Sequence, residues 1–241
     1  MSKANEKLTW TFLMSKIGNP YGVAGLMGNL YAESGINPKN LQNSGNKKLG
    51  FTDVEYTNRV QAKIISKKEF SKDGFGYGIA QWTYHTRKEK MYDFCMASGG
   101  IGDLVTQLEF LWKELQGYKT VLKTLKNAKT IREASDIVLL KYERPADQSE
   151  KVQKKRSEYG RMMFEKYSPT AKKKYVKINA KSVNIRLKPG KSGKAIEIGE
   201  KGDLFEFVGQ DSETGWYQIV ARNGEKAWVT NKNTYTSIVE E

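Results

Sequence analysis

Cysteine and histidine are almost absent from this chain of 241 residues, since each occurs once. A single cysteine, Cys95, excludes an intrachain disulfide framework. A single histidine, His85, argues against a zinc hydrolase, because such enzymes hold their metal with two or three histidines. Catalysis by a Cys95–His85 pair is disfavoured as well, since Cys95 lies between apolar helix positions and suits a buried structural role. We expect neither a metal nor a cofactor.

Long apolar runs are missing too. No segment approaches the roughly 18 consecutive apolar residues that a membrane-spanning helix needs. The first ten residues contain no apolar core of a signal peptide. We therefore expect no export signal and no stable membrane insertion, and we predict synthesis in the cytoplasm. Hydrophobic residues make up 38% of the sequence and aromatic residues 11%, which is enough for a folded protein with a core.

Acidic residues are fewer than basic ones. Lys and Arg number 41 against 27 Asp and Glu, which gives a net charge of +14. The excess is uneven, because residues 1–173 carry a net +12 and residues 174–241 only +2. A strongly basic chain is attracted to polyanions such as nucleic acid, anionic lipid or an anionic cell wall. Charge alone does not choose among these partners.

The first 167 residues have the apolar spacing of helices. This spacing covers residues 8–18, 20–34, 54–67, 87–98, 103–115, 130–143 and 149–167, with glycine-rich loops between them. Residues 168–174 form a short, polar, basic stretch that predicts a linker. We therefore predict a mainly helical first domain over residues 1–167.

The pattern then changes to short β-type runs. These cover residues 175–180, 183–187, 195–199, 204–209, 216–221, 226–230 and 235–239, separated by turn sequences such as "EKGD" and "RNGE". Short strands with frequent turns are typical of a small barrel or sandwich. The predicted fold class is α+β in two domains, a helical domain followed by a small all-β domain over residues 175–241.

A carboxylate stands where the second predicted helix ends. Glu33 lies in "GNLYAESGINP", one residue before a Ser-Gly break. On a helical wheel it falls at the edge of the apolar stripe that contains Leu26 and Leu30, so we expect it to be half-buried. It also lies near the negative end of the helix dipole. Burial and dipole both disfavour a charged carboxylate, which suits a general acid. A solvated glutamate before a glycine stop is the alternative.

Two later stretches carry chemistry suited to a sugar. "KDGFGYGIAQWT" combines glycines, which let backbone approach a ligand, with the amide of Gln81 and the ring of Trp82. "KYERP" closes a later helix with Tyr142, Glu143 and Arg144. A turn with a core tryptophan, and a helix-capping ion pair, are the respective structural alternatives.

Taken together, "E-S-G-I-N-P", "G-Y-G-I-A-Q-W-T" and "Y-E-R-P", in this order, resemble the phage tail lysozyme group of the lysozyme-like superfamily. The resemblance covers about residues 8–166. It implies cleavage of the bond between N-acetylmuramic acid and N-acetylglucosamine, with Glu33 as the catalytic acid. It places Gly78 and Gln81 in the cleft and matches Tyr142 to the late tyrosine of lytic transglycosylases. We also expect Trp82, Thr83, His85 and Glu143 to contact the substrate, Trp82 because its ring offers a flat apolar face to a sugar and His85 because it follows the "QWT" element.

The sequence leaves open which residue supplies a second catalytic carboxylate. Relatives of the goose type carry candidate aspartates beside the "G-x-x-Q" element, and here Thr83 occupies the downstream place while Asp73 lies near the upstream one. Asp53 and Glu55 are further candidates. A second carboxylate would activate water or act as nucleophile. Without one, the C6 hydroxyl of the substrate would attack, as in lytic transglycosylases.

The β-type segment resembles a bacterial SH3 domain over about residues 175–239. "VNIR" with the following "PG", "GWYQI" and "KAWV" carry this resemblance. It implies binding to a cell wall of the Gram-positive type. The aromatic residues predicted to offer a binding face are Trp216, Tyr217, Trp228 and Tyr235, and each has a barrel-core position as its alternative. Phe205 and Phe207 are predicted core residues.

The leading hypothesis is a phage endolysin, a monomer that cleaves the peptidoglycan of Gram-positive walls. It would reach the wall through a membrane pore made by a separate protein. The alternatives are a transglycosylase, a tail-borne lysin, and a wall-binding protein with an inactive site. A nucleic-acid binder is suggested by charge alone and has no motif to support it.

Overall fold

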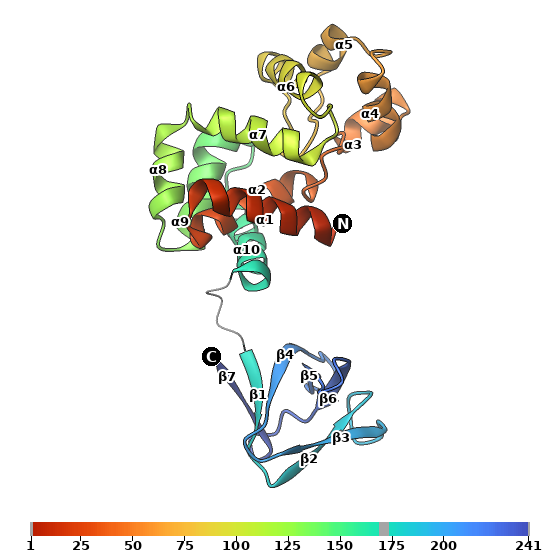
Figure 1. Ribbon diagram of the computed structural model, residues 1–241, viewed down its shortest axis with the longest axis vertical. Coiled ribbons are helices and arrows are strands. Elements are labelled where there is room, and N and C mark those ends of the chain that lie inside the picture. Colours follow the sequence, from red (N-terminus) through yellow and green to blue (C-terminus); the bar gives the residue numbers. More distant parts are fainter. Residues whose placement is uncertain (1, 169–173, 241) are drawn as a thin grey trace. The chain divides into compact units, whose positions relative to one another are not determined.

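The structure is a computed structural model that describes residues 2–168 and 174–240. Contacts between Cα atoms divide the chain into two compact units, Met1–Thr170 and Ala171–Glu241. Described residues of the first unit form helices, whereas those of the second form antiparallel strands (Figure 1). This confirms the predicted fold class. Most of the predicted linker, residues 168–174, lies outside the described residues.

The helices of the first unit largely follow the predicted segments. In order they are α1 (Lys3–Ile17), α2 (Pro20–Ser34), α3 (Asn43–Leu49), α4 (Asp53–Gln61), α5 (Lys67–Lys72), α6 (His85–Ala97), α7 (Leu104–Leu115), α8 (Lys119–Asn127), α9 (Ile131–Val138), the π-helix η1 (Leu139–Glu143) and α10 (Glu150–Tyr167). None of the described helices is both long and apolar enough to cross a bilayer.

The prediction of one helix over residues 54–67 is wrong. Helix α4 ends at Gln61, and Lys63 then adopts a left-handed backbone with φ of 60°. Ser66 starts α5 with a capping box, in which its side chain and that of Glu69 each accept a backbone N–H of the other residue. The short helices α3, α5 and α8 were not predicted. Helices α3 and α5 have only 7 and 6 residues, too few turns for a clear apolar period. Helix α8 does carry a local signal, since Val121 and Leu125 are spaced four residues apart and are both buried.

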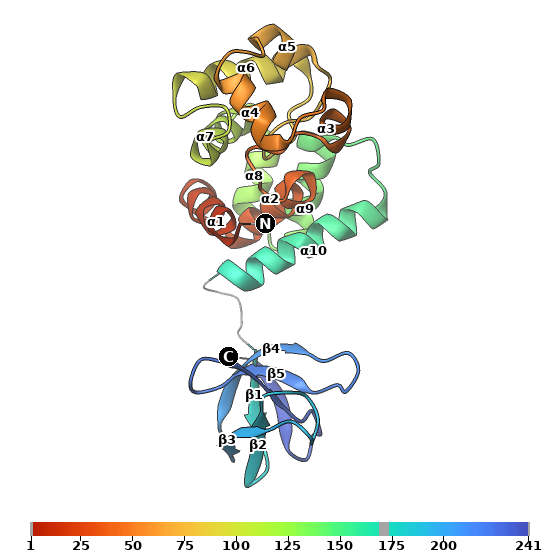
Figure 2. The same ribbon diagram turned by 90° about the vertical axis from the view of Figure 1, so that its right-hand side faces the viewer.

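The helices of the first unit form two groups. Figures 1 and 2 show α3 to α6 together at one end and α1, α2, α8, α9 and α10 at the other, with α7 running between them. One hydrophobic core includes residues of both groups, from Leu13 and Leu26 to Tyr77 and Met91.

Helix α2 is the buried centre of the second group. Asn19 caps its first turn, Pro20 occupies the first helical position, and Gly35 ends it in a left-handed conformation. Every residue from Gly22 to Leu30 is buried, because α1, α8, α9 and α10 surround the helix. The predicted one-sided apolar stripe is therefore wrong, and Glu33 is half-buried because it lies at the helix end.

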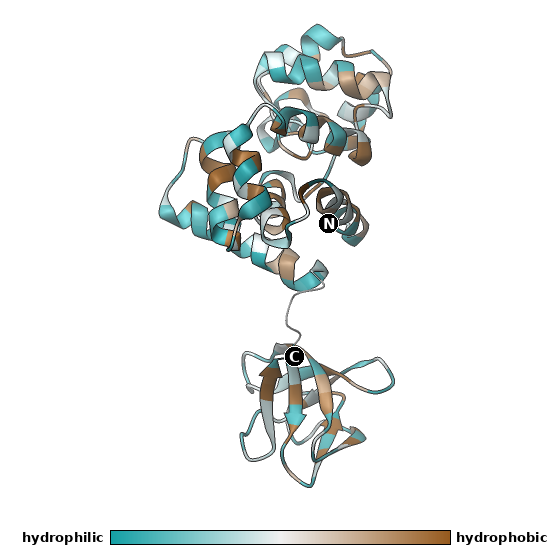
Figure 3. Cartoon of the chain, turned by 60° about the vertical axis from the view of Figure 1, so that its left-hand side comes forward, coloured by the Kyte–Doolittle hydropathy of each residue, from teal (hydrophilic) through white to brown (hydrophobic). Residues whose placement is uncertain are grey.

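Helix α10 packs directly on α2. A Cβ atom at Gly28 would lie 2.3 Å from the carbonyl oxygen of Arg156, so only glycine permits this approach. Figure 3 shows α10 as a mostly hydrophilic helix, in keeping with its many lysines and glutamates. The close approach brings one residue of this polar helix, Arg156, into the interior.

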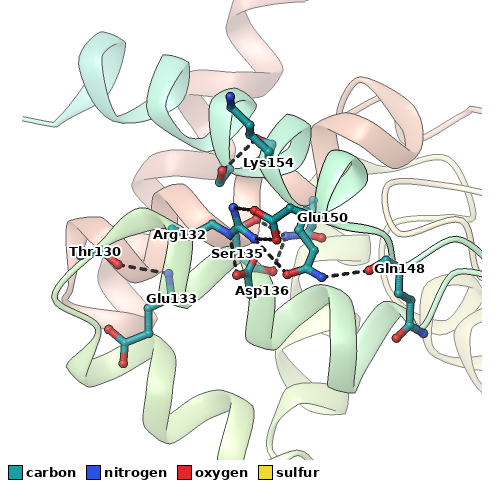
Figure 4. Close-up of polar contacts among 11 residues, drawn as sticks. Thr130, Arg132, Glu133, Ser135, Asp136, Gln148, Glu150 and Lys154 are labelled. Atoms are coloured by element: carbon teal, nitrogen blue, oxygen red, sulfur yellow. Dashed lines mark hydrogen bonds and ion pairs between the residues drawn. The ribbon is translucent and has the colours of Figure 1, made fainter.

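Polar contacts fix the start of α10 against α9. Arg132 donates to both carboxylate oxygens of Glu150 at 2.9 and 2.8 Å, to Asp136 at 2.5 Å, and to the side-chain oxygen of Gln153 at 3.1 Å (Figure 4). Gln153 in turn donates to the backbone oxygen of Gln148. A bidentate arginine–carboxylate pair is geometrically specific, so this cluster anchors the segment that leads from η1 into α10.

The second unit is an antiparallel sheet. Its strands are β1 (Lys174–Ile178), β2 (Ser182–Arg186), β3 (Ala195–Glu200), β4 (Leu204–Gln210), β5 (Tyr217–Val220), β6 (Lys226–Val229) and β7 (Thr236–Glu240), and their order across the sheet is β3-β2-β6-β5-β4-β1-β7. All seven predicted strands are present. Val176, Ile178, Ile185, Phe205 and Ile219 are among its buried core residues, while Phe207 is half-buried against that core.

Candidate active site

A cavity of about 620 Å³ opens at the C-terminal end of α2. Its size is typical of a small-molecule or oligosaccharide site. Side chains from α2, from the loop that precedes α6, and from the segment after η1 meet there. The lining residues are Glu33, Gln42, Ala80, Gln81, Thr83, Tyr84, Arg87, Glu143, Arg144, Pro145 and Ala146. Four residues predicted from the sequence, Glu33, Gln81, Thr83 and Glu143, are thus brought together.

Glu33 lies in the last turn of α2 with its side chain 19% exposed. It is half-buried, as expected. Its carboxylate oxygen Oε1 accepts a hydrogen bond of 2.6 Å from Arg156 of α10. This arginine is almost fully buried and brings a positive charge that the local sequence around Glu33 does not show.

A network of amide and hydroxyl groups holds Arg156 in place. Its second guanidinium nitrogen donates to Oδ1 of Asn29 at 3.2 Å. The side-chain NH₂ of Asn29 donates to the backbone oxygen of Gly25 and to Ser135 of α9. All these groups are buried, where unpaired polar groups are costly, and Nε of Arg156 has no hydrogen-bond acceptor among the described residues. Three helices therefore fix the direction from which Arg156 meets Glu33.

The second carboxyl group in the cavity is Glu143, the last residue of η1. A π-helix widens the turn, and Arg144 follows with a left-handed backbone at φ of 50°. Glu143 is only half-buried as a residue, yet its oxygen Oε1 is inaccessible and receives no hydrogen bond from the described residues. Burial, followed by the nearby charge of Glu33, raises the pKa of Glu143 to about 8. Raised carboxyl pKa values of this kind are common at catalytic sites.

The loop before α6 forms one wall of the cavity. Tyr77 and Trp82 form an isolated antiparallel β-bridge. Of the residues between them in the chain, Gly78 and Gln81 each have a positive φ. The side-chain NH₂ of Gln81 donates to both oxygens of Asn40 and to the backbone oxygen of Gly78. Gln81 lines the cavity, but its donors stabilise the loop. Gly78 is not among the lining residues.

Trp82 and Tyr142 are not among the residues that line the cavity. Both are buried, and both donate to Oε2 of Glu114, at 2.7 and 2.8 Å. Arg87 donates to both oxygens of the same carboxylate at 2.9 Å. Burial opposes the charged form of Glu114, but the hydrogen bonds and charge of Arg87, with those of Trp82 and Tyr142, outweigh it and lower its pKa. The predicted transglycosylase-type tyrosine thus has a structural partner.

Asp73 lies outside the cavity. Its carboxylate pairs with the buried Lys88 at 2.5 Å and also accepts from the hydroxyl of Tyr56. The other two candidate carboxylates also have local partners: Asp53 accepts from Leu41 and Asn46, and Glu55 belongs to the capping box of α4. None of the three lines the cavity that contains Glu33.

The single histidine and the single cysteine of the chain, His85 and Cys95, do not line the cavity either. His85 is exposed at the start of α6 and is not a lining residue. Cys95 is buried, as predicted, and burial raises the pKa of its thiol to about 12. A thiol of this kind is a poor nucleophile at neutral pH.

Sequence reasoning missed several residues of the site. Tyr84 follows the "QWT" element directly and is 63% exposed at the cavity, so an exposed aromatic next to the motif was a usable signal. Arg156 lies 123 positions from Glu33, and nothing local in the sequence marks it. Gln42 and Arg87 also became visible only in three dimensions.

A second cavity, of about 340 Å³, lies in the β unit. Trp216 and Tyr235 line it together with Arg186, Lys191 and Lys232. The other two predicted binding aromatics differ: Tyr217 packs edge-to-face on Phe207, with ring centroids 5.6 Å apart, and neither Tyr217 nor Trp228 lines the cavity. The structure thus places two of the four predicted aromatic residues in the cavity and two outside it.

These features define the class of protein: a helical domain with a carboxyl-lined cavity, followed by a small β domain with an aromatic cavity. Comparison with protein families gives a match to the phage tail lysozyme model over residues 4–167 and to the bacterial SH3 domain over residues 181–235. The chain belongs to the phage tail lysozyme family. Both resemblances found in the motifs are confirmed, and they make this a lysozyme-like, peptidoglycan-degrading protein with a wall-binding domain. No curated protein matches the chain.

Proposed function

We propose that this protein is an endolysin that cleaves the glycan strand of peptidoglycan at the β-1,4 bond between N-acetylmuramic acid and N-acetylglucosamine. The observation that supports this most is the cavity at the end of α2, where Glu33 and Glu143 meet. Glycoside hydrolysis needs a carboxyl group that can donate a proton to the leaving oxygen. Glu33 is that donor in our proposal, because its side chain is 19% exposed and lines the cavity, whereas Oε1 of Glu143 is inaccessible.

The cavity offers the other elements of a sugar site. Tyr84 and Thr83 are both exposed at the cavity, and the hydroxyl of Thr83 donates to the backbone oxygen of Gln81. Arg144 adds positive charge at the wall, where Arg87 is already paired with Glu114. As the glycosidic bond breaks, positive charge develops on the sugar ring, and the carboxylate left on Glu33 stabilises it.

Wall attraction is the role that we assign to the net charge and to the β unit. The chain carries +14, most of it in residues 1–173. Gram-positive walls carry phosphate polymers, which attract basic proteins over distances of about the Debye length. The cavity lined by Trp216 and Tyr235 would then bind the wall itself. In this proposal the enzyme is made in the host cytoplasm and passes through a pore formed by another protein.

Mass spectrometry of the muropeptides released from purified Gram-positive walls tests the reaction. Wild type, Glu33→Gln and Glu158→Gln should be compared, the last as a matched control because Glu158 is exposed on α10. We expect glycan cleavage by wild type and the control but not by Glu33→Gln. Reducing muramic acid ends would mean hydrolysis. Anhydro ends would mean transglycosylation, in which the C6 hydroxyl attacks. Cleavage by Glu33→Gln at the wild-type rate would refute the assignment of Glu33.

A further inference from the structure

Two segments that are distant in the sequence meet at one wall of the cavity. Residues 40–42 and 76–78 pair as a short antiparallel bridge, in which the backbone N–H of Gln42 donates to the backbone oxygen of Gly76 at 2.8 Å. Gln42 belongs to the first segment, and Gln81 follows the second. Both glutamines line the cavity that contains Glu33.

The side-chain amide of Gln42 is held by its oxygen. Oε1 accepts the backbone N–H of Gly76 at 2.9 Å. An N–H group needs an acceptor opposite it, so this contact fixes which end of the amide is the oxygen. The NH₂ end makes no hydrogen bond to the described residues, and Gln42 is exposed at the cavity. Gln42 therefore offers free donors to a ligand.

The side-chain amide of Gln81 is held by its opposite end. Its NH₂ group donates to two oxygens of Asn40 and to the backbone oxygen of Gly78. Its oxygen Oε1 receives no hydrogen bond from the described residues. A Cβ atom added at Gly76 would lie 2.7 Å from this oxygen, so the glycine that binds Gln42 also adjoins Gln81. The wall thus combines a free donor with a free acceptor.

This pair of groups matches a secondary amide, which carries one carbonyl acceptor and one N–H donor. Both sugars of the glycan strand carry such a group as their acetamido substituent. The stem peptide contains amides as well, but it is attached through the lactyl group of muramic acid, whereas an acetamido group belongs to every sugar that passes Glu33. A few well-placed polar groups of this kind fix the orientation of a ligand in its cavity.

We propose that Gln42 is a specificity-determining residue: its NH₂ group donates to the carbonyl oxygen of an acetamido group of the glycan, while Oε1 of Gln81 accepts the N–H of the same group. The proposal rests on the proposed function, in which the glycan occupies this cavity. A sugar without the acetyl group leaves the donors of Gln42 unpaired, and a site built to hydrogen-bond a substrate rejects an analogue that lacks the partner group.

Nitrogen-15 NMR of the full-length Glu33→Gln protein tests the contact directly, because the side-chain NH₂ group of Gln42 has its own signal. The probes are glycan fragments freed of peptide by an amidase, the same fragments after removal of their acetyl groups, and the released stem peptide. We expect the Gln42 signal to move with the first probe and to stay in place with the second. A signal that no probe moves, or that only the stem peptide moves, would overturn the proposal.

Gln42→Glu in the same background provides the second readout, since it keeps an oxygen for the N–H of Gly76 and removes only the donors. We expect acetylated fragments to bind roughly tenfold more weakly, because an oxygen then faces the acetamido oxygen. Backbone signals of Ala80 and Tyr84, which line the cavity, follow this binding. The weakening should vanish or reverse for fragments without acetyl groups, whose ammonium group meets the new carboxylate.

Gln116→Glu is the matched control for the added charge. Gln116 is exposed and does not line the cavity, so the binding of both kinds of fragment at the cavity should stay as it was. Equal weakening of acetylated and deacetylated fragments in Gln42→Glu would overturn the proposal, because a general effect of charge or shape would then explain the result. Thermal unfolding of each variant shows whether the wall stays folded.

These experiments separate the proposal from the proposed function. If acetylated fragments move the Gln42 signal but the wild-type protein does not cleave purified walls, the acetamido contact stands and the glycosidase assignment fails. If walls are cleaved but Gln42→Glu binds acetylated fragments as tightly as its background does, the glycosidase assignment stands and the role of Gln42 is refuted.

Discussion

Gly28 lies directly against the backbone of Arg156, so that a Cβ atom added at position 28 would meet the carbonyl oxygen of Arg156 at 2.3 Å. This relationship joins two helices that are distant in the sequence and sets how far the Arg156 side chain reaches. The guanidinium then bonds to Glu33, five positions further along α2. A glycine in the middle of a helix thus determines the geometry of the candidate active site.

Two opposing effects therefore decide how Gly28→Ala changes the stability of the folded protein. Helix propensity alone favours alanine over glycine by up to about 1 kcal/mol. The contact with α10 works in the opposite direction, because backbone must move, and overpacking typically costs about 1–3 kcal/mol. We expect net destabilisation and a loss of lysis beyond the loss of folded protein. Thermal unfolding and lysis rate measure both. A more stable, fully active variant would show that α10 is free to shift.

The helix that carries Glu33 was predictable from the sequence because its signals are local. Apolar spacing from Val23 to Tyr31 defines the helix, and Gly35 marks its end. Arg156 was not predictable in this way, since its place beside Glu33 depends on the packing of α10. Asp73 suggested a catalytic base by position in the chain, but the buried cation of Lys88 holds it elsewhere.

Glu143 was found in the sequence as part of "YERP", but its environment was not. Its burial depends on the widened turn of η1 and on the left-handed backbone of Arg144. Neither feature has a local signature, because arginine rarely adopts a positive φ. The strands of the β unit were easier to predict, since alternation and glycine turns are visible over a few residues.

The pH dependence of stability supplies a prediction for Glu143 that is independent of activity. Its pKa is raised to about 8 in the folded protein, so between the ordinary glutamate value and that pKa the folded state binds more protons than the unfolded state. The free energy of unfolding of the wild type then falls as pH rises through this window.

Glu143→Gln removes this dependence. We expect the variant to gain stability relative to wild type by up to about 1.4 kcal/mol per pH unit above pH 5, and the difference to level off above pH 8. Below the ordinary glutamate pKa both proteins carry a neutral group, so their difference should be constant. Urea unfolding at several pH values measures it. A difference that does not change with pH would contradict the raised pKa.

Tyr84 tests whether the cavity binds a sugar. Its ring is 63% exposed and lines the cavity, next to the ring of His85 at 4.7 Å. Removing an exposed ring costs little stability but removes apolar contact area for a ligand. We expect Tyr84→Ala to raise the KM for soluble glycan fragments roughly tenfold, equivalent to about 1.4 kcal/mol, with little change in Tm.

Two further variants control for this change. Tyr84→Phe keeps the ring and should retain most of the binding. Ile64→Ala removes an exposed apolar side chain outside the cavity and should leave KM unchanged. An equal KM for Tyr84→Ala and wild type would show that the glycan does not contact this wall.

The β unit separates the four predicted wall-binding aromatics into two pairs. Trp216 and Tyr235 line its cavity, and Tyr235 is 44% exposed. Tyr217 packs against Phe207. Trp228 is half-buried on β6, and its partner in the antiparallel register with β2 is Arg186. We therefore expect Trp216→Ala and Tyr235→Ala to weaken wall binding because they remove contact surface from the cavity, whereas Tyr217→Ala should act through loss of stability.

Co-sedimentation with purified Gram-positive walls distinguishes these effects, using the Glu33→Gln background so that the walls stay intact. Losing a hot-spot aromatic typically costs 2 kcal/mol or more, so we expect binding to weaken by roughly thirtyfold in Trp216→Ala with an unchanged Tm of the β unit. Cleavage of soluble fragments by Trp216→Ala in the active background should stay near wild type, since the described residues that line the candidate active-site cavity belong to the helical unit. Loss of both activities together would instead assign the β unit a structural role.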